Sequence, residues 1–139
     1  MTKKPLINVL ALALLLCDFA CASTKHTLAH SPRIPAAQGV VYIEKTKNDN
    51  TKISLSVKHL AYPKDIDPSK NFFVVWVTPQ NREEAAQNVG ALKVDKDLIG
   101  SLDTVVPFDE FKLSITAESS PTMLHPSGDP LLWTDVTRK

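Results

Sequence analysis

The sequence predicts an all-β protein: a seven-stranded, immunoglobulin-like antiparallel sandwich over residues 39–139. A signal peptide over residues 1–22 and a flexible linker over residues 23–38 are expected to precede it. Three observations lead to this prediction. Apolar and polar side chains alternate with a period of two, and the short apolar segments are separated by Asn, Asp, Pro and Gly. The 139-residue chain is also long enough for one core and shows no internal repeat.

The first segment has the pattern of an export signal. Lys3 and Lys4 precede an apolar run from Leu6 to Cys17, and the small residues Ala20–Ala22 follow. This run is shorter than the roughly 20 apolar residues that cross a bilayer, which favours a cleaved signal peptide over a membrane anchor. We expect cleavage before Ser23 and a protein that is periplasmic or secreted.

A lipoprotein attached to the membrane is the alternative form of export. Ala20 precedes Cys21 as it does in lipoprotein signals, and lipidation of Cys21 would hold the protein on a membrane. Asp18, however, stands where such signals carry an apolar residue. If the signal peptide is cleaved before Ser23, the mature chain contains no cysteine and therefore no disulfide.

Residues 23–38 are expected to form a flexible tail. The segment STKHTLAHSPRIPAAQ contains two prolines and two histidines and has no apolar periodicity. Such a composition is typical of a mobile connection that holds a domain away from the membrane or export site. The folded domain is therefore expected to begin near Gly39.

The sandwich strands follow in order along the chain. Residues 52–58 alternate strictly and place Ile53, Leu55 and Val57 on one face, as an antiparallel strand with one buried face requires. Residues 71–78 are apolar on both faces, which indicates a central strand. The Asn- and Asp-containing segment 47–50 predicts a hairpin turn, because these residues tolerate left-handed backbone angles. The other predicted strands cover residues 40–46, 91–95, 102–106, 110–118 and 131–136.

A short helix over residues 82–87 is the one helical candidate, and it is expected to decorate a loop. Without a disulfide, the domain must be stabilised by packing of large apolar side chains. The expected core contributors are Leu55, Phe73, Trp76, Phe111, Ile115 and Trp133.

Composition and motifs exclude several function classes. The net charge is +1, and removal of the signal peptide would leave equal numbers of acidic and basic residues, so nucleic acid is not an expected partner. No phosphate-binding glycine motif and no Gly-x-Ser-x-Gly nucleophile motif is present. We therefore expect no cofactor and no catalytic residues. A hydrolase remains a rival, and it would need a deep cleft with an acid of shifted pKa.

A metal-handling protein of the periplasm is the other alternative. His26 and His30 are four residues apart, and Met123 and His125 could add a soft ligand and an imidazole for copper or zinc. A blue-copper centre also needs a cysteine thiolate, which the mature chain lacks, and a structural zinc site would need more Cys and His. These four residues are the candidate metal ligands.

The order of short motifs between residues 72 and 136 resembles a known family. The motifs are Val75-Trp76-Val77, Asn88-Val89-Gly90-Ala91-Leu92, Gly100-Ser101-Leu102, Ile115-Thr116-Ala117-Glu118 and Pro126-Ser127-Gly128. Together they resemble the extracytoplasmic C-terminal β-sandwich domain of anti-sigma-K-type factors and related exported bacterial proteins. The resemblance implies a bacterial source and a non-catalytic sensing or protein-binding role in the cell envelope. The 12-residue apolar run is too short for that family's transmembrane helix, and we expect this protein to correspond to the outer domain alone.

On this reading the partner is another envelope protein, bound through loops and strand edges. The loop Tyr62–Lys70 and the insertion at residues 80–88 are the expected contact sites.

Overall fold

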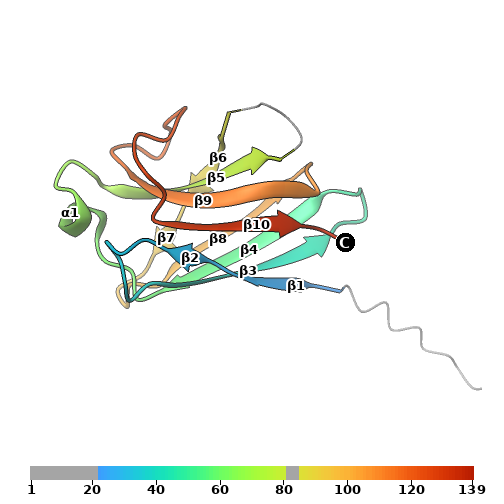
Figure 1. The fold of residues 1–139 in the computed structure, drawn as a ribbon, viewed down its shortest axis with the longest axis horizontal. Coiled ribbons are helices and arrows are strands. Elements are labelled where there is room, and N and C mark those ends of the chain that lie inside the picture. The colour runs from blue at the N-terminus through green and yellow to red at the C-terminus, as the bar shows by residue number, and fades with distance from the viewer. Residues whose placement is uncertain (1–21, 81–84) are drawn as a thin grey trace, which may run out of the picture.

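The computed structural model describes residues 22–80 and 85–139, and these residues form a β-sandwich of two five-stranded antiparallel sheets (Figure 1). The first sheet has the order β1-β3-β4-β8-β7 and the second the order β2-β10-β9-β5-β6. The first sheet comprises β1 (Thr24–Thr27), β3 (Gln38–Lys45), β4 (Thr51–Lys58), β8 (Gly100–Val106) and β7 (Lys93–Val94). The second comprises β2 (Ala29–His30), β10 (Leu132–Thr137), β9 (Glu110–Glu118), β5 (Phe72–Pro79) and β6 (Gln87–Ala91). The single helix among them, α1 (Pro63–Ile66), is one turn long.

The strand order is that of an immunoglobulin-like fold. Strands β3, β4, β8 and β7 occupy the positions of A, B, E and D, while β5, β9 and β10 occupy those of C, F and G. The all-β sandwich is thereby confirmed. The expected count of seven strands is wrong, because the described residues form ten. Each predicted strand overlaps an observed one, and β1, β2 and β6 are additional.

The core lies between the sheets and is built by strand alternation. Leu55 on β4, Phe73 on β5 and both Phe111 and Ile115 on β9 are at most 3% exposed and belong to one apolar cluster. These four were correctly predicted to be core residues. Alternation places their neighbours on the outer faces of the sheets.

The expected flexible linker is instead part of the sandwich. Strand β1 pairs with β3 through Thr24 to Thr27, and β2 pairs with β10. Between them Leu28 donates a hydrogen bond from its N–H to the Gly39 carbonyl at 2.9 Å, and its side chain is buried. Ile34 and Ala37 are buried as well. The domain therefore begins at Thr24, and its first strand passes from one sheet to the other at Leu28.

The prediction that both tryptophans are buried core residues is confirmed for Trp76 and is wrong for Trp133. Trp133 pairs with Ser114 on the outward face of the second sheet and is only half-buried. Trp76 also lies on that outward face, opposite Ser114, yet it is completely buried. The apolar cluster includes Val75 and Val77 but not Trp76. Another segment of the chain must therefore cover Trp76.

The connections agree in part with the predictions. Asp49 has a φ of 62° in the β3–β4 hairpin, which confirms the turn expected at residues 47–50. Part of the expected helix over residues 82–87 lies outside the described residues, and Gln87 already belongs to β6. Both ends of the described chain lie at the same end of the sandwich, opposite α1 (Figure 1). None of the described helices is long and apolar enough to span a membrane.

Candidate functional site

A groove with exposed aromatic side chains lies beside α1. Its lining consists of Tyr62, Pro63, Asn71, Phe72, Phe73, Leu92, Val94 and Asp95, and its volume is about 230 Å³. We call it the aromatic groove. Tyr62 is 54% exposed and Phe72 is 39% exposed, so both aromatic side chains are accessible from solvent.

Local sequence holds this groove in shape. Pro63 begins α1, and the Asp65 N–H donates to the Tyr62 carbonyl at 3.0 Å. The Asp67 carboxylate then accepts hydrogen bonds from the Ser69 N–H and hydroxyl at 2.9 and 2.7 Å. These bonds, led by that from the Ser69 N–H, hold the pKa of Asp67 below its usual value. The loop 62–71 is therefore a fixed platform.

Of the two phenylalanines at the start of β5, one is buried in the core and the other is exposed in the groove. Phe73 points inward, and its carbonyl accepts a hydrogen bond from the Leu92 N–H at 2.8 Å, which closes the groove floor. Phe72 has the opposite orientation and stays exposed, as alternation requires. The only carboxylate in the lining, that of Asp95, accepts hydrogen bonds from the N–H groups of Asp97 and Ile99. The groove thus offers rigid apolar contact rather than reactive groups.

A buried polar network explains how Trp76 is covered. The Trp76 indole N–H donates to the Thr116 hydroxyl at 2.8 Å, and this hydroxyl donates to Oε1 of the Glu118 carboxylate at 2.6 Å. Glu118 Oε1 also accepts from the Ser127 N–H at 2.9 Å, while Oε2 accepts from the Ser127 hydroxyl at 2.5 Å. Lys70 Nζ donates to that same hydroxyl at 2.7 Å. The network fastens the loop of residues 119–131, the β9–β10 loop, to the outer face of the second sheet.

The surroundings of Glu118 stabilise the ionised form of its carboxyl group. Burial raises the pKa of the carboxyl, but the hydrogen bonds from Ser127 and Thr116 and the charge of Lys70 outweigh burial and lower the pKa below 4.5. A carboxylate held ionised in this way is a poor proton donor and a weak base. The adjacent pocket, which Arg33, Lys70 and Ser127 help to line, measures only about 130 Å³. It does not provide the deep cleft that the hydrolase alternative requires.

Asn88 supplies the second attachment of the β9–β10 loop. Its side-chain amide donates to the carbonyls of Pro121 and Met123 at 2.9 and 3.0 Å. Its side-chain oxygen accepts from the Gly90 N–H at 2.9 Å, and Gly90 has a φ of 133°, which disfavours any other residue. The pairing of β5 with β6 shifts register at this point. Sequence reasoning quoted Asn88, Glu118 and Ser127 as motif residues but did not predict that they act together.

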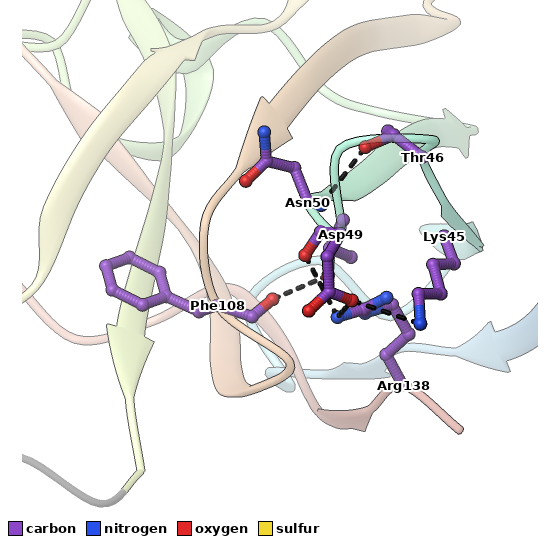
Figure 2. A network of polar contacts seen from close by, with 7 residues as sticks. Lys45, Thr46, Asp49, Asn50, Phe108 and Arg138 are labelled. Atoms are coloured by element: carbon purple, nitrogen blue, oxygen red, sulfur yellow. Dashed lines mark hydrogen bonds and ion pairs between the residues drawn. The ribbon is translucent and has the colours of Figure 1, made fainter.

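The opposite end of the sandwich is closed by ionic contacts (Figure 2). Arg138 donates to the carboxylate and the carbonyl of Asp49 at 3.0 and 3.2 Å, and Lys45 Nζ lies 3.1 Å from the same carboxylate. The bonds from Arg138 and then Lys45 lower the pKa of Asp49. Thr51 donates from its hydroxyl to the Phe108 carbonyl at 2.6 Å. This cluster ties the C-terminus to two loops.

The candidate metal ligands are distributed over different elements. His26 lies on β1 opposite Val41, with a buried Nε2 that has no hydrogen-bond partner, whereas His30 is exposed on β2. Met123 and His125 lie in the β9–β10 loop. Among residues 22–80 and 85–139, no three His, Cys, Asp or Glu side chains are placed to share a metal ion. Cys21, the candidate lipidation site, lies outside the described residues.

The chain matches no protein-family model and no curated protein sequence at a significant level.

Proposed function

We propose that the protein is a non-catalytic, exported binding module of the bacterial cell envelope, whose aromatic groove contacts another envelope protein. The observation that carries the proposal is the pair of exposed aromatic side chains, Tyr62 and Phe72, on a platform fixed by hydrogen bonds. Partly exposed aromatic residues in a rigid depression are typical anchors of protein–protein interfaces. The N-terminal sequence supports export, with Ser23 as the first mature residue.

Charge balance supports recognition by apolar contact. The mature chain would carry equal numbers of acidic and basic residues, so long-range electrostatic attraction is not available to gather a partner. The kinship to the outer domains of anti-sigma-K-type factors is part of this proposal and agrees with a sensing or protein-binding role.

Site-specific photocross-linking in the native cells tests the binding role. A photoreactive residue at position 62 is expected to give a discrete protein adduct, and the Phe72→Ser substitution should abolish this adduct. The matched control is position 105, where Val105 is 53% exposed opposite Lys52, five residues along β8 from Gly100, which pairs with Val94 of the groove lining. Absence of an adduct at position 62, or equal adducts at both positions, would refute the proposed contact.

Mass spectrometry of the protein from the same cells tests export. A chain that begins at unmodified Ser23 supports signal-peptide cleavage. A lipid on Cys21 would instead establish the lipoprotein form, and an intact Met1 would contradict export by either route.

A further inference from the structure

A second groove runs across the outward face of the first sheet, on the strands β1, β3 and β4. Lys25, Gln38, Val40, Tyr42, Ser56 and Lys58 line it, and its volume of about 280 Å³ exceeds that of the aromatic groove. We call it the lysine groove. Strand pairing explains its composition: Tyr42 lies between Lys25 and Ser54, and Val40 lies opposite Ser56. All of these positions have the same outward parity.

The charge of the lysine groove is uncompensated. No acidic residue lines it. Within the described residues, Lys25 and Lys58 take part in no ion pair or side-chain hydrogen bond, whereas the neighbouring Lys52 lies 4.0 Å from Glu44. Two free ammonium groups in one depression favour an anionic ligand.

The spacing of the lysines requires an extended ligand. Lys25 on β1 stands opposite Tyr42 on one side of β3, and Lys58 on β4 stands opposite Gln38 on the other side. The two lysines are thus separated by four residues along the strands and by two strand spacings across the sheet. With about 3.4 Å per residue along a strand and about 4.8 Å between strands, the two Cα atoms lie roughly 17 Å apart. A ligand that reaches both lysines therefore carries at least two negative charges and covers Tyr42 between them.

The position of the groove disfavours a peptide. Strand β3 is paired with β1 and β4, and β4 is paired with β8, so the free edge that these three strands offer is the outer edge of β1. A peptide that added there as a strand would lie beside the sheet and not across Tyr42. Recognition must use side chains alone. Tyr42, which is 43% exposed, offers a flat apolar surface, and Gln38 and Ser56 offer amide and hydroxyl groups for hydrogen bonds. A sugar ring, with one apolar face and a rim of hydroxyls, matches this set.

We infer that the lysine groove binds an acidic polysaccharide segment, with carboxylates at Lys25 and Lys58 and a sugar ring against Tyr42. This site is separate from the aromatic groove and does not depend on the proposed protein partner. The two sites lie on different surfaces, so substitutions in one leave the other intact.

Calorimetry on the processed protein purified from its native cells tests the inference with an oligomer of galacturonate as the probe. We expect binding that weakens as salt is added, because exposed charges are screened. Tyr42→Ala and Lys58→Gln are each expected to weaken binding by about tenfold. The matched control Lys52→Gln, a lysine on the same face but outside the groove, should change the affinity by less than about twofold.

Three results would overturn the inference. They are no heat of binding with the galacturonate oligomer, equal affinity of Tyr42→Ala and the unsubstituted protein, and equal binding of a neutral glucose oligomer. Tighter binding of oligoglutamate than of oligogalacturonate would also refute it, in favour of an acidic peptide. A Phe72→Ser variant that keeps glycan binding but loses the protein cross-link from position 62 would show that the two sites are independent.

Discussion

Substitution of Glu118 by glutamine tests whether the buried polar network holds the β9–β10 loop. Glutamine keeps the size of the side chain but replaces Oε2, which accepts from the Ser127 hydroxyl, with an N–H donor. Three hydrogen bonds converge on the carboxylate, from Thr116 and twice from Ser127. Bonds to a charged group contribute about 1.5–3 kcal/mol each and neutral bonds about 0.5–1.5 kcal/mol, so we expect Glu118→Gln to lower stability by about 2–4 kcal/mol.

The pH dependence of stability provides an independent test of the role of Glu118. The pKa of Glu118 is lowered in the folded protein, so the folded state binds a proton on this group less readily than the unfolded state. Its contribution to stability is therefore complete above its ordinary pKa of 4.5 and is lost as pH falls below that value toward the folded-state pKa. The Glu118→Gln variant should lack this part of the acid destabilisation.

The loss of stability is measured by urea unfolding at neutral pH. The proteins compared are the original, the single variants Glu118→Gln and Ser127→Ala, and the double variant. Because both residues belong to one network, the losses should not add, with a coupling of about 1 kcal/mol or more. Additive losses, or a Glu118→Gln variant as stable as the original with the same acid response, would refute the reasoning.

The remaining predictions concern packing and are measured as changes in unfolding free energy. Phe111→Ala, at a completely buried position, should lower stability by about 3–5 kcal/mol, and an unchanged melting curve would remove this residue from the core. Trp133→Ala, at a half-buried outer position, should lower it by about 1–2 kcal/mol, and a loss equal to that of Phe111→Ala would contradict its placement. Gly100→Ala should lower it by about 1–3 kcal/mol, because a Cβ there would lie 2.8 Å from Leu60 and 3.0 Å from Leu92. A more stable Gly100→Ala variant would show that both leucines move aside freely.

Strand alternation made much of the fold predictable. The alternating apolar residues Ile53, Leu55 and Val57 predict β4, and Phe111 and Ile115 predict β9 in the same way. A strand with one buried face needs an apolar residue at every second position, so its sequence shows a period of two. The error at Trp133 came from counting a large side chain as core without applying that period. Leu132 and Val136 share the inward parity of β10, and Trp133 has the opposite one.

The N-terminal strands could not be predicted by the same method. Strands β1 and β2 are four and two residues long and belong to different sheets, so the inward parity changes at Leu28 before a period can be recognised. The burial of Ile34 and Ala37 depends on their packing in the apolar cluster between the sheets, which is a tertiary contact.

The polar network escaped prediction because its members meet only through a tertiary contact. Glu118, on the outward face of β9, has the parity of a solvated residue, and it is buried only because the β9–β10 loop returns across the sheet to place Ser127 beside it. The aromatic groove was predictable in position, since the loop Tyr62–Lys70 was expected to make contacts. Its shape depends on Leu92 and Val94, which come from another part of the chain. The lysine groove has no linear motif, because three strands each contribute one or more of its residues.

The chain enters and leaves the sandwich at one pole, and α1 marks the other (Figure 1). If the protein is attached to a surface through either terminus, the end of the sandwich that carries α1 and Tyr62 would therefore lie farthest from that surface. A sensor chip loaded through the C-terminus and one loaded through residue 22 should therefore present the same α1 end to a partner in solution.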